Sequence, residues 1–150
     1  MANIIIIGSG PAGISAALYT KRAGIDTTII TKGSGSLLKA ESIENYYGFA
    51  EPVTGEELEK AGIEGAKKLG VEFVEEEVVG LNFDGKLVVE TASKTYSADG
   101  VILATGSARL APNISGLKEL EGRGVSYCAV CDAFFYRGKD VCVLGSGEYA

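Results

Sequence analysis

The chain has 150 residues, 46% of them hydrophobic, and a formal net charge of −6 at pH 7. This length and composition predict a globular fold, and the acidic balance argues against nucleic acid as a partner, since nucleic-acid-binding proteins usually carry a basic face. The apolar runs near the N-terminus are far shorter than a membrane span or a signal-peptide core, so we expect a soluble, cytoplasmic protein that does not enter a membrane.

The first 31 residues predict one strand–helix–strand unit. Residues 4–7 are a continuous run of isoleucine, which is typical of a strand buried on both faces of a parallel sheet. A helix is expected over residues 14–23, with Pro11 in its first turn and Gly24 after its end. Residues 27–31 predict the next strand. Together these elements are the smallest piece of a nucleotide-binding fold.

A glycine-rich turn joins the first strand to the helix and has the sequence Gly8-Ser9-Gly10-Pro11-Ala12-Gly13. In this pattern Gly8 permits a tight turn, Gly10 lets phosphates approach the backbone, and Gly13 lets the helix pack close to the strand. The turn therefore predicts a site for the pyrophosphate of a dinucleotide at the N-terminus of the helix.

The end of the second strand lacks the acidic residue that usually binds the ribose of a dinucleotide. Thr31 and Lys32 occupy this place. We therefore expect the ribose to be held differently, by residues around Thr31 and the loop that ends at Ser36.

Residues 40–49, which include two adjacent tyrosines, predict a long functional loop.

The middle of the chain predicts one more helix and several strands. Thr54 and Glu57 fit a capping box for a helix that ends near Leu69. Residues 71–79 predict a strand, residues 86–91 and 95–97 a small antiparallel insertion, and residues 100–104 a second buried parallel strand. Frequent proline and glycine over residues 112–124 predict a domain boundary. The expected divisions are thus 1–111, 112–124 and 125–150.

A pair of cysteines, Cys128 and Cys131, follows this boundary and is spaced as Cys-x-x-Cys. Such a pair is a redox dithiol, half of a metal site, or a coincidence. Zinc is disfavoured because the chain has only three cysteines and no histidine, so we expect no metal. A helix beginning at the second cysteine would favour its thiolate, and Asp132 is the nearest candidate for general acid–base work. Cys142 is expected to be a small buried hydrophobic residue.

A second glycine turn follows a predicted strand over residues 140–144 and includes Gly145, Gly147 and Ala150. Because a strand–helix–strand unit needs about 30 residues, a second nucleotide-binding domain is only begun here. We therefore expect the chain to be part of a longer protein. The predicted fold class is α/β, a Rossmann-like fold with a parallel sheet and a small antiparallel insertion.

Four segments together resemble low-molecular-weight thioredoxin reductases. They are GSGPAG (residues 8–13), IENYYGF (43–49), ATG (104–106) and GRGVSYCAVCDAFFY (122–136), the last being long and highly specific. The resemblance covers the whole chain and about the N-terminal half of such an enzyme. It implies an FAD-binding domain that is split in sequence by an inserted NADPH-binding domain.

The resemblance also implies roles for individual residues. Residues that would contact FAD are the first glycine turn, Asn45 near the flavin, the Val78 backbone at the adenine, and Ala104, Thr105 and Gly106 near the cofactor. The residues that would begin the NADPH site are Gly145, Gly147 and Ala150. Ser36, Tyr47 and Ala133 depart from the family pattern, which commonly has glutamine, proline and glycine at these places.

By the same resemblance, Cys131 would face the flavin, Cys128 would attack thioredoxin, and Asp132 would be the acid–base residue. Electrons would pass from NADPH through FAD and the dithiol to thioredoxin in a homodimeric enzyme, and residues 1–150 alone would be inactive. Two alternatives remain open: a related flavoprotein that uses reduced ferredoxin or another donor, and a non-catalytic nucleotide-binding protein in which the dithiol is a regulatory switch.

Overall fold

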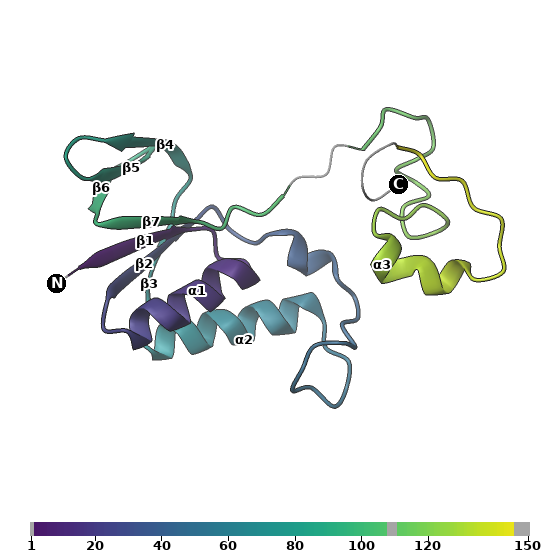
Figure 1. Ribbon diagram of the computed structural model, residues 1–150, viewed down its shortest axis with the longest axis horizontal. Helices are drawn as coiled ribbons and strands as arrows, with labels where there is room; N and C mark the ends of the chain where they lie inside the picture. The colour runs from purple at the N-terminus through teal and green to yellow at the C-terminus, as the bar shows by residue number, and fades with distance from the viewer. Residues whose placement is uncertain (1, 108–110, 146–150) are drawn as a thin grey trace. The chain divides into compact units, whose positions relative to one another are not determined.

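The computed structural model describes residues 2–107 and 111–145, without the side chains of residues 130 and 131. The chain divides into two compact units, residues 1–108 and 109–150, and each is considered by itself (Figure 1). Among the described residues, no helix combines the length and the apolar character that crossing a membrane requires.

The first unit is built on a four-stranded parallel sheet in the order β3-β2-β1-β7. Its strands are β1 (Asn3–Ile7), β2 (Asp26–Thr31), β3 (Glu72–Glu75) and β7 (Gly100–Leu103). The helices α1 (Pro11–Arg22) and α2 (Gly55–Lys68) lie side by side along one face (Figure 1). The predicted α/β class with a parallel sheet is confirmed.

The run of isoleucines is buried on both faces of this sheet, as its lack of alternation predicts. Ile6 and Ile29, both fully buried, pack in one cluster with Ala17 of α1 and Ala66 of α2. On the opposite face, a second cluster joins Ile5, Ile7 and Ile30 of the sheet to two buried residues of the antiparallel strands, Val89 and Ala98.

The antiparallel insertion has three strands, β4 (Val78–Phe83), β5 (Leu87–Thr91) and β6 (Thr95–Ala98), in the order β4-β5-β6. The prediction of one strand over residues 71–79 is wrong. The chain leaves the parallel sheet after Glu75 and enters the antiparallel sheet at Val78, so Glu76 and Glu77 link two different sheets. The strand predicted over residues 86–91 is observed as β5, and it consequently pairs with β4 as well as with β6.

The start of α2 confirms the predicted capping box. The backbone N–H of Glu57 donates to the Thr54 hydroxyl at 3.1 Å, and the backbone N–H of Thr54 donates to the Glu57 carboxylate at 2.9 Å. These two bonds satisfy donors that would otherwise have no partner at a helix N-terminus. Before α2, a 3₁₀ turn η1 (Ser36–Lys39) and a bridge between Ile43 and Val53 organise the preceding loop.

The second unit contains turns, one four-residue helix α3 (Ala129–Asp132) and a 3₁₀ turn η2 (Ala133–Tyr136). The strand predicted over residues 140–144 is not formed, and Cys142 is exposed instead of buried. A strand needs a neighbouring strand to accept and donate its backbone hydrogen bonds. Within the described residues, no strand pairs with this segment, and Val141 and Val143 are accordingly more than 60% exposed.

Candidate functional site

The first glycine turn lies at the carboxyl end of the parallel sheet, where β1 has β2 on one side and β7 on the other. The backbone N–H of Gly8 donates to the Ile30 carbonyl of β2 at 2.9 Å, and that of Ala104 donates to the Ile7 carbonyl of β1 at 2.9 Å. In open α/β sheets, ligands bind outside the carboxyl ends of the strands at the point where the chain crosses to the other side. The turn occupies such a point.

The three glycines of the turn meet different surroundings. A Cβ on Gly8, whose φ is +109°, would lie 2.3 Å from the Ala104 carbonyl oxygen, and a Cβ on Gly13 would lie 2.0 Å from the Gly8 carbonyl oxygen. A Cβ on Gly10 would meet nothing within 4 Å. Gly8 and Gly13 therefore permit close packing of the chain, whereas Gly10 faces open space through which a ligand can approach the backbone.

Among the described residues, no side chain caps the N-terminus of α1, so none competes with a bound anion for its backbone N–H groups. Gly10 is the N-cap residue and offers no side chain, Pro11 occupies the first turn, and that turn contains no acidic residue. The backbone N–H groups of Ala12 and Gly13 have no acceptor within the helix, and the helix dipole places positive potential beside them. This end of α1 therefore fits a diphosphate group, as a bound dinucleotide such as FAD would present.

Ser9 and Thr31 connect the glycine turn to the end of β2. Ser9 is buried, and its hydroxyl lies 2.9 Å from the Thr31 hydroxyl. Thr31 Oγ1 also lies 3.0 Å from the Gly33 carbonyl oxygen and accepts from the Gly33 N–H at 3.3 Å. These bonds hold the turn against the loop that follows β2. The neighbouring Lys32 pairs with Glu77 at 2.9 Å, so the usual place of the ribose-binding acid carries a paired ammonium group.

The remaining predicted cofactor residues lie on several elements of the first unit. Ser36 begins η1, Asn45 lies exposed in the loop after the Ile43 bridge, and Val78 begins β4. Residues 104–106 follow β7, with Ala104 against the glycine turn and Gly106 at a φ of +72°. Thus Ser9, Thr31 and Ala104 come together at the turn, whereas Ser36 and Asn45 make no hydrogen bond to it within the part of the chain that is described.

Glu59 on α2 is a buried acidic residue that the sequence analysis missed. It is only 8% exposed, and its Oε1 atom is buried without a hydrogen-bond partner. It shares a helix face with Gly55, where a Cβ would lie 1.8 Å from the Leu37 carbonyl oxygen of η1, and with Gly62, where a Cβ would lie 3.4 Å from Ile14 Cγ2 of α1. Glu59 follows Gly55 by four residues and precedes Ala66 by seven, and residues at these spacings lie on one face of a helix. This spacing is the sequence signal that could have shown that Glu59 is buried.

The second predicted site, around the dithiol, lies in the second unit. Cys128 is half-buried and is part of a disulfide bond, whereas Cys142 is a free thiol. The side chain of Cys131 lies outside the described part of the structure. A helix that begins at Cys131, the condition under which its thiolate would be favoured, is not formed, since α3 begins at Ala129. The Asp132 backbone N–H donates to the Cys128 carbonyl at 3.0 Å, which closes this short helix.

Ser126 joins the two described residues of this second site, and the sequence analysis did not single it out. Its hydroxyl accepts from the Cys128 backbone N–H at 3.1 Å and donates to Asp132 Oδ2 at 2.5 Å. The available signal was a serine two residues before the first cysteine, because serine hydroxyls often bond to nearby backbone groups in turns.

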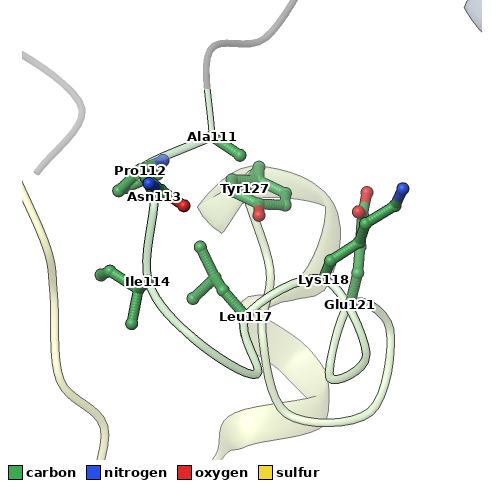
Figure 2. A pocket seen from close by; sticks show the side chains of 8 residues that line it. All are labelled: Ala111, Pro112, Asn113, Ile114, Leu117, Lys118, Glu121 and Tyr127. Atoms are coloured by element: carbon green, nitrogen blue, oxygen red, sulfur yellow. The ribbon is translucent and has the colours of Figure 1, made fainter.

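A pair of exposed aromatic rings and a pocket flank the dithiol in the sequence. Phe134 and Phe135 are 73% and 67% exposed, and their rings meet edge to face with centroids 6.0 Å apart. Tyr127, directly before Cys128, lines a pocket of about 350 Å³ (Figure 2). The other residues that line it are Ala111, Pro112, Asn113, Ile114, Leu117, Lys118 and Glu121.

The site of the second glycine turn is described only at Gly145, which is exposed; Gly147 and Ala150 lie outside the described residues.

The sequence matches the family of pyridine nucleotide-disulphide oxidoreductases over residues 2–150. The chain belongs to this family. It is 45% identical to a thioredoxin reductase of Bacillus subtilis, over 99% of this chain and 48% of that protein. It is 43% identical to a bifunctional thioredoxin reductase/thioredoxin of Mycobacterium leprae, over 99% of this chain and 33% of that protein.

A solved structure has the same fold. The thioredoxin reductase of Streptococcus pyogenes superposes with a TM-score of 0.78 and 38% identity, over 90% of this chain and 45% of that one. The chain spans about half the length of the thioredoxin reductases that it matches, and the matched part is their N-terminal half. The resemblance predicted from the four sequence segments is thus confirmed.

Proposed function

We propose that the full protein is a thioredoxin-disulfide reductase, which passes electrons from NADPH through FAD and the Cys128–Cys131 dithiol to thioredoxin. The observation that carries this proposal is the disulfide-bonded Cys128 within a chain that is 38–45% identical to thioredoxin reductases over at least nine-tenths of its length. The same resemblance supports a cytoplasmic homodimer, with an NADPH-binding domain inserted after about residue 112.

The first unit would hold FAD. The open space at Gly10 and the uncapped N-terminus of α1 support a diphosphate there, and the contact of Gly8 with Ala104 keeps the turn in place. When bound, the flavin would relay an electron pair between the nicotinamide and the disulfide. The residues that the family resemblance adds to this site are Ser36, Asn45, Val78, Thr105 and Gly106.

The dithiol would reduce a partner disulfide by two successive exchanges. The Cys128 thiolate attacks one sulfur of the partner, which forms a mixed disulfide and releases a partner thiolate that takes up a proton. The Cys131 thiolate then attacks the Cys128 sulfur, which restores the Cys128–Cys131 disulfide and releases the second partner thiol. Two electrons and two protons thus leave the dithiol and reach the partner. Asp132 is the proposed carrier of one of these protons, and the exposed Phe134 and Phe135 support a protein partner at this surface.

The test is the anaerobic visible spectrum of the full-length protein during addition of NADPH. We expect the flavin bands to bleach and about two thiols to appear per chain, with thioredoxin disulfide then restoring the bands. Bands that persist with NADPH and bleach only with reduced ferredoxin would contradict the proposed donor. Bleaching without new thiols would contradict the role of the dithiol.

A further inference from the structure

We propose that Ser126 is a positioning residue, whose hydroxyl holds the Asp132 carboxylate beside the Cys128 end of the disulfide for proton transfer. The inference rests on the proposed function of the dithiol and of Asp132. It concerns three residues that the structure joins directly, Ser126, Cys128 and Asp132, which we call the serine network.

The direction of the hydrogen bonds in the serine network follows from the donors available. The Cys128 backbone N–H can only donate, so the Ser126 oxygen accepts it at 3.1 Å. The single hydroxyl proton of Ser126 then has two acceptors, Asp132 Oδ2 at 2.5 Å and the Cys128 carbonyl at 3.4 Å. The shorter contact to a charged acceptor is the stronger one, so the proton points at the carboxylate.

Asp132 is therefore held at two points. Its backbone N–H donates to the Cys128 carbonyl at 3.0 Å, and its carboxylate accepts from Ser126. An aspartate side chain held only through its backbone can rotate about two bonds, whereas the second contact selects one orientation. Ser126 itself is exposed, and Asp132 and Cys128 are half-buried, so the network lies where both solvent protons and a partner can reach it.

This orientation matters because each half-reaction moves protons at sulfur. Reduction of the Cys128–Cys131 disulfide would break the S–S bond with an electron pair from NADPH, for which FAD would supply the relay when bound, and the two resulting thiolates would take up two protons. When the dithiol reduces a partner, the same two protons leave. Asp132 would carry one of them, and Ser126 would gain or lose none: it would only fix where the carboxylate stands.

The experiment measures thiol–disulfide exchange in the full-length, FAD-loaded protein after chemical reduction with dithiothreitol and removal of the reductant. The oxidant is a small aromatic disulfide, so the measured rate depends neither on NADPH nor on thioredoxin docking. The variants are Ser126→Ala, Ser126→Thr, Asp132→Asn and the double variant Ser126→Ala/Asp132→Asn. Thermal unfolding and the flavin spectrum of each variant show whether it is folded and loaded.

We expect Ser126→Ala to slow exchange about tenfold, a part of the factor that general acid–base catalysis contributes. Ser126→Thr keeps a hydroxyl and should restore the rate to within about twofold. In the Asp132→Asn background, Ser126→Ala should cause no further slowing, because a residue that acts through another is not additive with it. Equal slowing in both backgrounds, or equally slow Ala and Thr variants, would overturn the proposal.

Failure of the proposed function has a different signature. If NADPH does not reduce the disulfide but the effects of Ser126 and Asp132 are non-additive after chemical reduction, the role of the serine network stands and NADPH is not the donor. If NADPH does reduce the disulfide but the effects of the two substitutions are additive, the proposed function stands and the role of Ser126 is refuted.

Discussion

The Ala104 carbonyl oxygen lies so close to Gly8 that there is no room for a side chain on Gly8: a Cβ there would lie 2.3 Å from that oxygen. Gly8 follows β1 and Ala104 follows β7, so the contact fixes the two chain segments that leave neighbouring strands at the same end of the sheet. The backbone of Gly8, at a φ of +109°, is also unfavourable for any residue with a side chain. The glycine turn is thus shaped from within the protein, independently of any ligand.

Replacing Gly8 with alanine should therefore destabilise the fold. The positive φ and the contact with the Ala104 backbone both oppose a Cβ, and we expect the free energy of unfolding to fall by at least about 2–3 kcal/mol. Urea denaturation of the full-length protein measures this. Gly24→Ala is the matched control, because Gly24 has a φ of +78° but open space around its Cβ position. Equal losses in the two variants would show that the Ala104 contact carries no cost.

Replacing Gly10 with alanine should separate folding from cofactor binding. Gly10 has an extended backbone with a φ of −68°, and a Cβ there would meet no protein atom within 4 Å. The thermal midpoint of the apoprotein should therefore remain unchanged. The methyl group would occupy the space proposed for the diphosphate of FAD, so the Kd for FAD should rise by about tenfold or more, which corresponds to about 1.4 kcal/mol. An unchanged Kd would place the diphosphate elsewhere.

The stability of the first unit should depend on pH through Glu76. The Thr91 hydroxyl and then the Ser93 hydroxyl donate to this carboxylate and hold the pKa of Glu76 below its ordinary value of 4.5. A pKa that is lower in the folded state means that the stabilisation is present above pH 4.5 and is lost as the pH falls through the folded-state pKa. Thr91→Val should flatten this loss below pH 4.5.

The measurement is the urea midpoint of unfolding between neutral pH and pH 3. Thr91→Val should also lower the midpoint at neutral pH, because the Thr91 hydroxyl also accepts from the Lys94 backbone N–H at 3.0 Å. The matched control is Thr95→Val, at an exposed threonine of β6. A Thr91→Val protein with the pH dependence of the parent would show that Glu76 does not carry it.

Replacing Cys131 with serine should abolish disulfide reduction without loss of FAD, if this thiol faces the flavin as proposed. Serine has nearly the size of cysteine but cannot form a disulfide, so turnover of thioredoxin should fall to background while the flavin absorbance remains. Cys142→Ser is the control, because Cys142 is free and exposed. Retained turnover in the Cys131→Ser protein would refute the assigned role.

The first strand–helix–strand unit could be predicted because its signals are local. The isoleucine run of β1 and the glycine turn each specify their structure within a few residues, and so does the Thr54–Glu57 capping box at the start of α2. The break between β3 and β4 could not be predicted in the same way. In residues 71–79, valine and phenylalanine flank three consecutive glutamates at 75–77, and glutamate is only mildly depleted in strands. The break is set by pairing of the two halves with different sheets.

The misses at the candidate sites have the same origin. Residues 140–144 have the composition of a buried strand, but without a neighbouring strand among the described residues Val141 and Cys142 remain exposed. Ser126 and Asp132 are six residues apart, and their contact depends on the turn that Cys128 makes between them. A sequence pattern shows residue types and spacing, whereas both features depend on how the backbone folds back on itself.

Replacing Glu59 with methionine should stabilise the protein. Glu59 lies on the buried face of α2, and its Oε1 atom has lost water without gaining a hydrogen bond, which costs free energy. Methionine has a similar volume and a good helix propensity, so it should pack in the same space. We expect the free energy of unfolding of the full-length protein to rise by about 1–2 kcal/mol.

The matched control is Glu64→Met, at an exposed glutamate on the same helix, for which no comparable gain is expected. A Glu59→Met protein that unfolds more easily than the parent would mean that the carboxylate makes a stabilising interaction in the full-length protein. The FAD content of the same variant then locates that interaction: lost flavin would place Glu59 at the cofactor, because α1, which packs against α2 through Ile14, begins within the glycine turn. Retained flavin with lower stability would place the interaction within the protein core.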